Sequence, residues 1–372
     1  MRIVIAPDKF KGSLTAGQAA DAIEGGFRAV WPDATYVTCP MADGGEGTVD
    51  VFVAAGAERR SARVHGPLGD PVDAWYAVEK NTAIVEMATA SGLALLPKDR
   101  YDPVLADTYG TGELLCAALD DGVEHIVVGI GGSATNDAGT GMLRRLGVRF
   151  LDARGDEIGA GAAGYERLEA IDLSHLDQRI ARIRLSVASD VDNPLTGPHG
   201  ASRTFALQKG ADDAQIALLD RVLGRIADVA AVAVGKDVRD QPGAGAAGGL
   251  GFALLAFLHG KIEPGVELIA RERGLPKLLE GAQLCATGEG KIDGQTLHGK
   301  TVYGVGKLAA ASGVPVVAFA GAIDREAVQP LNILGITVRA IAPKGSTPEE
   351  SMRRAGEFLK GAAAEFGKEV YG

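Results

Sequence analysis

The chain has 372 residues, a length that predicts two domains or one domain with a large insertion. Its formal net charge is −10, and this acidic balance argues against a nucleic-acid partner bound through phosphate contacts. The 46% of hydrophobic and 23% of charged residues are ordinary for a folded protein and exclude disorder over most of the length.

Cysteine use and hydropathy indicate a cytoplasmic protein. Cys39, Cys116 and Cys285 are too far apart in the sequence for a zinc ribbon or a redox pair, so we expect buried thiols in a reducing compartment. The N-terminal segment lacks the apolar stretch of a signal peptide. The longest uncharged run, 243–258, is shorter than the roughly 20 apolar residues that span a bilayer, so we expect a glycine-rich loop leading into a buried helix and no membrane partner.

The first 62 residues alternate between strand and helix patterns. Residues 2–6 form a short apolar strand, and 15–30 place apolar side chains on one helical face behind a capping box. A second strand at 35–39 and a helix at 48–55 follow. This alternation predicts a parallel sheet with helices on its faces.

The pattern changes near residue 62 and returns near residue 284. Strand-like segments at 61–65, 74–78 and 82–87 have short connections that predict antiparallel hairpins. The later elements are a helix at 111–119, strands at 125–130, 183–188, 284–287, 314–320 and 336–341, and helices at 302–311, 324–334 and from Pro348. We therefore expect a discontinuous Rossmann-like domain, 1–62 and 282–372, interrupted by an inserted α/β domain, 63–281.

Glycine is over-represented, at 52 residues, and much of it lies in loops that follow predicted strands. In the first such loop, 6–13, Lys9 and Lys11 beside Ser13 could receive an anion, or could be solvated lysines before a helix. In the second, 40–48, Asp43, Gly44, Gly45 and Glu46 could bind a cation or a hydroxyl, or could form a simple turn. Because open α/β sheets bind ligands at the carboxyl ends of their strands, both loops are candidate site segments.

The third loop, 129–141, has a glycine-rich backbone of the kind that approaches phosphate closely. Gly129, Gly131 and Ala134, with Asp152 after the next strand, also fit a dinucleotide fingerprint, although glycines at 139 and 141 fall where its helix should begin. This pattern supports an alternative function, an NAD-dependent dehydrogenase of a small hydroxy acid.

Two further loops carry acidic side chains. In the fourth, 189–202, Asp190, Asp192 and Asn193 could supply a general base or a magnesium ligand. In the fifth, 287–301, a match to the Walker A pattern ends in Lys300-Thr301, but the strand is predicted to end near Thr287, too early for that motif. We interpret the match as partial coincidence, with Glu289, Asp293 and Lys300 still candidates near a phosphate or metal.

Seven motifs in order resemble the type 1 glycerate kinase family over essentially the whole chain: APDKFKGSLTA, PMADGGEGT, DTYGTGELL, GIGGSATNDAGTGM, SDVDNPLTGPHGAS, GAGAAGGLG and TGEGKIDGQTLHGK. The resemblance implies an ATP- and Mg²⁺-dependent kinase of glycerate with two α/β domains and an active site in the cleft between them. It leans toward 2-phosphoglycerate over 3-phosphoglycerate as product. The family usually has Ser at position 9, which leaves Lys9 without a matching role.

From this resemblance we assign Asp190 as the general base and Lys11 as a second catalytic residue. The predicted substrate and phosphate contacts are Ser13, Asp43, Gly44, Gly45, Glu46, Gly131, Gly132, Ser133, Asn136, Asp192, Asn193 and Lys300. The predicted metal ligands are Asp43, Asp190, Glu289 and Asp293. The non-enzymatic alternative is a cytoplasmic sensor of small acids.

Overall fold

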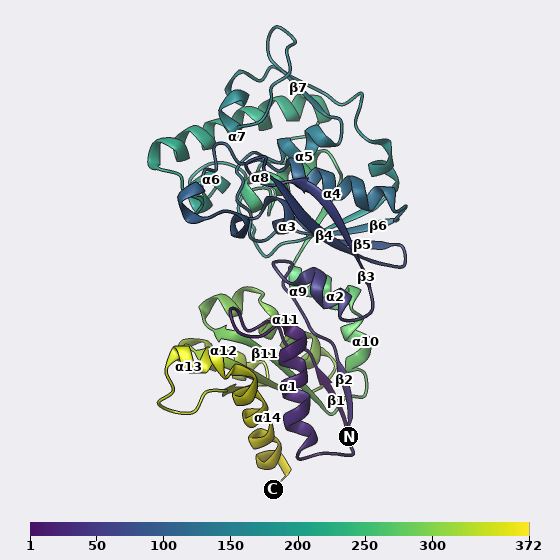
Figure 1. Cartoon of the computed structure of the whole chain (residues 1–372), viewed down its shortest axis with the longest axis vertical. Helices are drawn as coiled ribbons and strands as arrows, with labels where there is room; N and C mark the ends of the chain where they lie inside the picture. Colours follow the sequence, from purple (N-terminus) through teal and green to yellow (C-terminus); the bar gives the residue numbers. More distant parts are fainter. Residues whose placement is uncertain (372) are drawn as a thin grey trace. The chain divides into compact units, whose positions relative to one another are not determined.

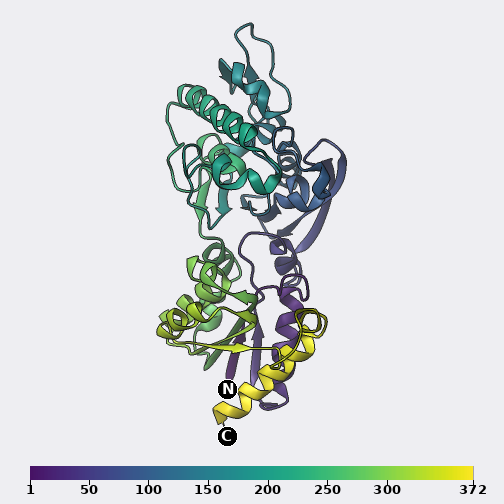
Figure 2. The same cartoon turned by 90° about the vertical axis from the view of Figure 1, so that its left-hand side faces the viewer.

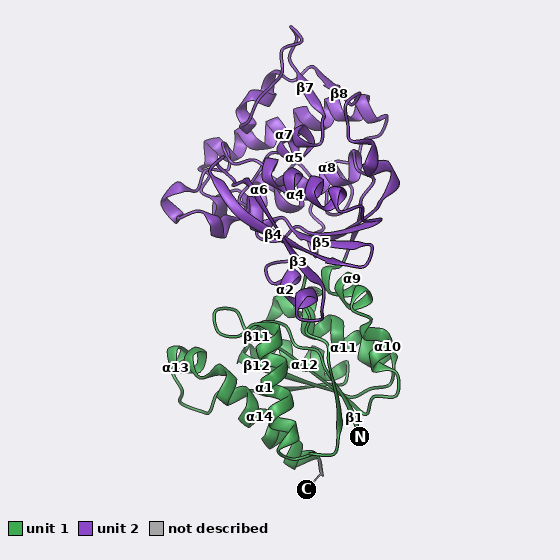
Figure 3. Cartoon of the chain, turned by 45° about the vertical axis from the view of Figure 1, so that its right-hand side comes forward, with its two compact units in different colours: residues 1–43, 264–372 green, residues 44–263 purple. Residues whose placement is uncertain are grey.

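The computed structural model describes residues 1–371, without the side chains of His298 and Tyr371. The chain divides into two compact units, which Figure 3 shows in green and purple. Unit 1 consists of residues 1–43 and 264–372, and unit 2 of residues 44–263. One unit is thus inserted into the other in sequence.

Unit 1 contains sheet A, whose five strands run in the spatial order β13, β12, β11, β1, β2 and pair in parallel throughout. The strands are β1 (Arg2–Ile5), β2 (Thr35–Thr38), β11 (Leu284–Ile292), β12 (Val316–Ile323) and β13 (Ile336–Ala340). The helices are α1 (Ala16–Arg28), α9 (Gly265–Glu272), α10 (Leu275–Leu279), η6 (Gly294–His298, a 3-10 helix), α11 (Thr301–Ala311), α12 (Arg325–Ile333), α13 (Pro348–Arg353) and α14 (Ala355–Tyr371). The predicted parallel, Rossmann-like sheet is confirmed.

Two helices from opposite ends of the chain pack together in unit 1. Figure 1 shows α1 and α14 side by side, and Figure 2 shows α14 in yellow beside sheet A. Phe27 of α1, Phe319 of β12 and Phe366 of α14 meet with ring centroids 6.2 to 6.4 Å apart. Helix α1 begins at the predicted capping box, in which Thr15 and Gln18 each accept the other's backbone N–H. The cluster of Phe27, Phe319 and Phe366 joins the C-terminal helix α14 to sheet A.

Unit 2 contains the mixed sheet B, with spatial order β10, β9, β6, β5, β4, β3. Its strands are β3 (Glu58–His65), β4 (Pro71–Glu79), β5 (Thr82–Glu86), β6 (His125–Gly129), β9 (Arg184–Ala188) and β10 (Lys261–Glu263), and a separate pair is β7 (Arg149–Leu151) with β8 (Ala170–Asp172). The predicted hairpins β3–β4 and β4–β5 are antiparallel, and β5, β6, β9 and β10 are parallel. The predicted mixed sheet is therefore confirmed as well.

The helices of unit 2 include one long helix that the sequence analysis does not predict, α7. The helices are α2 (Thr48–Val53), α3 (Ala88–Ser91), η1 (Leu93–Leu95), η2 (Lys98–Arg100), α4 (Tyr109–Asp120), α5 (Thr140–Arg145), η3 (Ala162–Arg167), η4 (Gln178–Arg182), α6 (Ala201–Phe205), η5 (Leu207–Lys209), α7 (Asp213–Val234) and α8 (Ala246–Ala256). Helix α7 starts at a capping box formed by Asp212 and Gln215, a signal that the sequence did contain. None of the helices that the structure describes combines the length and apolar character needed to cross a bilayer.

The two units divide after Asp43 and Glu263, earlier in each case than the expected positions at 62/63 and 281/282. Helix α2 belongs to unit 2 because it packs against β4 and β5, and because Glu86 at the end of β5 accepts the backbone N–H groups of Gly47 and Val49. Helix α9 belongs to unit 1 because it packs against α10 and α11. Helical periodicity shows that a helix has a buried face, but it does not show which sheet covers that face.

Candidate functional site

In unit 2, three of the predicted loops meet at the carboxyl ends of β5, β6 and β9. A Cβ atom added to Gly129 would lie 2.2 Å from the carbonyl oxygen of Gly44, and one added to Gly44 would lie 2.5 Å from the Cβ of Ala188. A Cβ on Gly131 would lie 3.0 Å from the Cα of Gly45. The glycines therefore allow the backbones of the second and third loops to pack directly on each other and on the end of β9.

The side chains of the fourth loop divide into exposed carboxylates and one amide that holds the loop. Asp190 and Asp192 are exposed just beyond β9, as is Glu46 in the second loop. Asn193 is half-buried, and its amide donates to the carbonyl oxygen of His199 at 2.7 Å and to the Thr204 hydroxyl at 3.4 Å. The two aspartates thus extend from a loop that Asn193 ties to the next helix.

The glycine-rich loop presents backbone at its start and buries its polar side chains. Gly132 has a φ of +77°, in the left-handed region that favours glycine. Ser133 retains 8% exposure, whereas Asn136 is fully buried and its amide donates to the hydroxyl of Ser202 at 2.9 Å. In this arrangement Asn136 supports the loop from inside, and the segment nearest the surface is 131–133.

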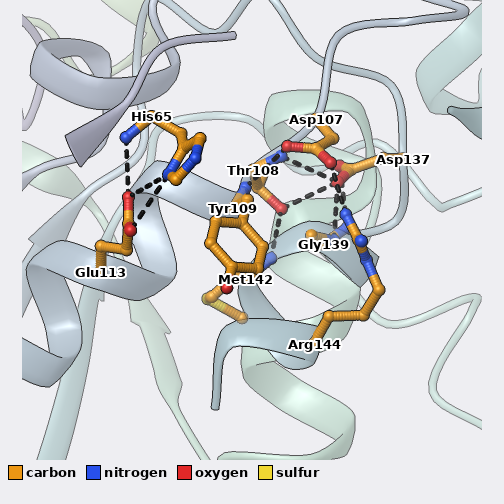
Figure 4. A network of polar contacts seen from close by, with 10 residues as sticks. His65, Asp107, Thr108, Tyr109, Glu113, Asp137, Gly139, Met142 and Arg144 are labelled. Atoms are coloured by element: carbon orange, nitrogen blue, oxygen red, sulfur yellow. Dashed lines mark hydrogen bonds and ion pairs between the residues drawn. The ribbon is translucent and has the colours of Figure 1, made fainter. Parts of the chain in front are cut away.

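A buried carboxylate holds the second half of the glycine-rich loop, as Figure 4 shows. Asp137 accepts both the backbone N–H and the hydroxyl of Thr108, at 3.0 and 2.8 Å, and also the N–H groups of Gly139 and Gly141, each at 3.1 Å. The Thr108 hydroxyl in turn accepts the N–H of Met142 at 2.9 Å. This network explains the motif at 107–115, to which the sequence analysis assigns no role: it anchors the loop.

An ion pair lies beside this anchor. Arg144 contacts Asp107 at 2.5 Å and lies 5.5 Å from the centroid of the Tyr109 ring. Burial, with the nearby charge of Asp137, raises the pKa of Asp107, while Arg144 and the Tyr109 N–H oppose that rise. No local sequence pattern indicates these partners, because the contacts join segments that are distant along the chain.

In unit 1, the first loop, which follows β1, packs against residues 288–290 of β11, a segment predicted as the start of the fifth loop. The backbone N–H of Asp8 donates to the carbonyl oxygen of Gly288 at 2.9 Å, and a Cβ on Gly290 would lie 3.1 Å from the nitrogen of Lys11. Lys11 is exposed, and the Ser13 hydroxyl donates to the carbonyl oxygen of Phe10 at 2.9 Å. The lysine at position 11 is therefore accessible, whereas Ser13 helps to close the turn.

Asp8 is a candidate site residue that the sequence motifs did not point out. Its buried carboxylate accepts the Lys9 N–H at 2.6 Å and the hydroxyl of Thr301. Burial, followed by the negative charge of Asp43, raises the pKa of Asp8 to about 6. Its place directly after the first strand is the signal that could have identified it.

Two further acids of unit 1 lie on β11 and just after it. Glu289 is buried, accepts the Thr296 hydroxyl at 2.6 Å, and has its pKa raised to about 7, chiefly by burial. Asp293 caps η6 and lies 3.9 Å from the Lys300 ammonium. The predicted residues of the fifth loop are thus close together, around a carboxylate that burial has made less acidic.

The predicted end of the strand before this loop is wrong. Strand β11 continues to Ile292, because residues 288–292 pair with β12, so the first glycine of the Walker A match follows the strand almost directly. The motif is nevertheless unlike a phosphate loop, because residues 294–298 form a 3-10 helix in which the Thr296 N–H bonds to the carbonyl oxygen of Asp293 at 3.0 Å. A backbone N–H used in this way cannot also receive a phosphate.

The raised pKa of Asp8 predicts a pH dependence of stability. The folded protein keeps a proton that the unfolded chain loses between about pH 4 and about pH 6. The free energy of unfolding should therefore fall, by up to about 1.4 kcal/mol per pH unit for this group, as the pH rises through that window. Asp8→Asn carries no charge and should lack this contribution.

Chemical unfolding of wild type and Asp8→Asn across this pH range tests the prediction. The wild type should lose stability relative to the variant up to about pH 6, with a constant difference above it. Asp21→Asn, an exposed acid on α1 in the same unit, is the control. A difference between wild type and Asp8→Asn that does not change with pH would contradict the prediction.

Comparison of the chain with known proteins identifies its family. A model of the glycerate kinase family matches residues 3–370. The chain belongs to the glycerate kinase family. It is 49% identical over 366 residues to a glycerate kinase of Halalkalibacterium halodurans, covering 97% of this chain and 96% of the relative. It is also 49% identical over 327 residues to glycerate 2-kinase of Escherichia coli, covering 87% of this chain and 86% of the relative.

A solved structure agrees with this membership. A crystal structure from Salmonella typhimurium LT2, assigned to glycerate kinase 2, superimposes with a TM-score of 0.90 at 44% identity and covers 100% of this chain and 98% of its own. As a glycerate kinase family member, the chain is an ATP-dependent kinase. The dehydrogenase alternative is not supported, because Asp152 accepts the N–H groups of Arg154 and Asp156 within a turn, and α5 begins only at Thr140.

The buried carboxylates of unit 1, Asp8 and Glu289, suit a magnesium ion that arrives with a nucleotide. Among the side chains that the structure describes, no group of three or more His, Cys, Asp or Glu is arranged to hold a metal ion. Mg²⁺ in kinases is usually held by one or two carboxylates together with substrate phosphates, so a resident protein cage is not needed. Asp8 and Glu289, each buried and raised in pKa, are donors whose negative charge such an ion would stabilise.

Proposed function

We propose that this protein transfers the γ-phosphoryl group of ATP to a hydroxyl of D-glycerate, forming 2-phosphoglycerate and ADP. The observation that carries the proposal is the match of the glycerate kinase family model over residues 3–370. The name of the E. coli relative, glycerate 2-kinase, supports the 2-position as the acceptor.

Asp190 is the proposed general base that accepts the proton of the glycerate hydroxyl. Its support is chemical and positional: it is an exposed carboxylate directly after β9, where the backbone of a central strand holds it. We assign Asp192 and Glu46 to the substrate hydroxyls. The backbone at 44–45 and 131–133 would receive an anionic group, because its glycines allow close approach. Asn193 and Asn136 would act by holding these loops.

The unit 1 residues are proposed to serve the nucleotide. Lys11 and Lys300 would neutralise charge on the phosphates, and Ser13 would shape the turn that carries Lys11. Asp8 joins the predicted carboxylates Asp43, Glu289 and Asp293 as a candidate, and one or two of these four would hold Mg²⁺ together with the ATP phosphates. Asp190 is assigned as base in preference to metal ligand. Bound with ATP, the ion would neutralise charge on the β- and γ-phosphates.

An ADP-release assay coupled to product analysis tests the function. D-glycerate should give ADP, while L-glycerate, glycolate and lactate should react more slowly. Phosphorus NMR with proton coupling identifies the product, because 2-phosphoglycerate carries its phosphate on a CH group and gives a doublet, whereas 3-phosphoglycerate gives a triplet. Stabilisation by glycerate without ADP release would instead support the small-acid sensor, and a triplet would correct the assigned position.

A further inference from the structure

A buried lysine contacts the glycine-rich loop of unit 2 from behind. Lys209, at the end of η5, is only 2% exposed. Its ammonium group donates to the hydroxyl oxygen of Ser133 and to the carbonyl oxygen of Thr135, both at 2.7 Å. Nothing in the local sequence around Lys209 indicates this contact, because Ser133 is far from it along the chain.

The chemistry of this contact determines the polarity of the Ser133 hydroxyl. An ammonium group has donors and no acceptor, so the Ser133 oxygen must accept from Lys209. The hydroxyl hydrogen then remains to be donated elsewhere, and no hydrogen bond donated by it is found among the described residues. Ser133 keeps 8% exposure and directly follows two glycines, Gly131 and Gly132. The pair therefore offers a hydrogen-bond donor at the loop.

The same loop contains further unused hydrogen-bonding capacity. The hydroxyl of Thr135 and the side-chain oxygen of Asn136 are fully buried and lack a hydrogen-bond partner among the described residues. Buried polar atoms are nearly always paired, by protein, ligand or ordered water. Unmet hydrogen-bonding capacity beside the Lys209 contact indicates a loop whose polar atoms are completed by a ligand or by ordered water.

We propose that the buried ammonium of Lys209 orients the Ser133 hydroxyl so that it donates a hydrogen bond to an anionic oxygen of a bound substrate, a carboxylate or phosphate oxygen. Lys209 is a positioning residue that acts on the ligand through Ser133. The identity of the anion rests on the proposed function: the glycerate carboxylate is one source and an ATP phosphate is the other.

The protonation state of Lys209 should control this orientation. Burial lowers the pKa of Lys209 to about 7, and the charged group acting on it is Asp137, which opposes that change. Once the amine is neutral, its lone pair can accept the Ser133 hydrogen, so Ser133 ceases to donate to the ligand. Anion affinity should therefore fall as the pH rises through the pKa of Lys209.

Equilibrium binding of the two substrates to Ser133→Ala tests the contact. Calorimetric titrations with D-glycerate and, separately, with Mg²⁺-ATP should show one ligand weakened by about 10- to 100-fold, the range for a lost hydrogen bond to a charged group. Weaker glycerate binding assigns the carboxylate, and weaker ATP binding assigns the phosphate. Ser186→Ala, which removes a buried hydroxyl from β9 that contacts His125, is the matched control and should bind both ligands as the wild type does.

Two measurements separate orientation from a merely structural role. In wild type, affinity for the identified ligand should fall from about pH 6 to about pH 9, and this dependence should be absent in Ser133→Ala. Lys209→Met should weaken binding, and Lys209→Met combined with Ser133→Ala should lose no more than the larger single effect.

Unchanged affinity of Ser133→Ala for both ligands would overturn the proposal, and so would an equal pH dependence in wild type and Ser133→Ala. The pH comparison does not depend on Lys209→Met folding. Failure of the proposed function is a different result, since wild type would then release no ADP with D-glycerate.

Discussion

Asp190→Asn is expected to lower kcat for glycerate phosphorylation by about 100- to 10,000-fold, the usual cost of removing a general base. Asparagine matches aspartate in size but cannot take the proton of the attacking hydroxyl. Asp190 is exposed at the end of β9, so the substitution leaves the core of unit 2 unchanged. ADP release at saturating substrate measures the effect, and thermal unfolding should match wild type.

Asp192→Asn is the matched control for this prediction. Asp192 is a second exposed acid of the same loop, assigned to substrate binding. Its replacement should raise KM for glycerate and change kcat by less than about 10-fold, because uniform binding affects KM alone. Near-wild-type kcat in Asp190→Asn, or equal losses of kcat in the two variants, would remove Asp190 from the role of base.

Gly248→Ala is expected to destabilise unit 2 by more than about 4 kcal/mol, the range of severe core substitutions. Gly248 has a φ of +67°, and an added Cβ would lie 2.0 Å from the carbonyl oxygen of Thr135 and 2.7 Å from the Cα of Asn136. Both contacts are with backbone, which cannot move aside as a flexible side chain can. The glycine-rich loop would have to shift, so substrate affinity should fall as well.

Gly122→Ala isolates the steric part of that cost. Gly122 has a similar φ of +73°, but no atom lies within 4 Å of the position that its Cβ would occupy. Its replacement should cost only about 1 to 2 kcal/mol, the penalty of the left-handed conformation. Urea unfolding followed by Trp75 fluorescence, in a Trp31→Phe background, reports on unit 2. Equal costs for the two glycines would show that the contacts at Gly248 relax without strain.

The sequence by itself determined the elements whose causes are local. The capping box of Thr15 and Gln18 starts a helix whatever that helix packs against. Strand-like segments with short connections predicted that β3, β4 and β5 are antiparallel. The position of polar loops after strands also marked the candidate site segments, since parallel strands end at a common edge. It did not predict that the second loop, expected in one domain with the first, packs on the third loop and on the end of β9. Local hydrogen bonds and side-chain period carry this information within a few residues.

Only the tertiary structure decided the features that depend on contacts between distant segments. Helix α2 joins unit 2 because Glu86 holds its first turn, Asp137 is anchored by Thr108, and Lys209 reaches Ser133. Pairing with β12 likewise extends β11 beyond its predicted end. In each case the residue type is compatible with several roles, and the partner that selects one is brought near only when the chain folds. Burial then changes the acidity of the enclosed groups. It raises the pKa of Asp8 and of Glu289 and lowers the pKa of Lys209.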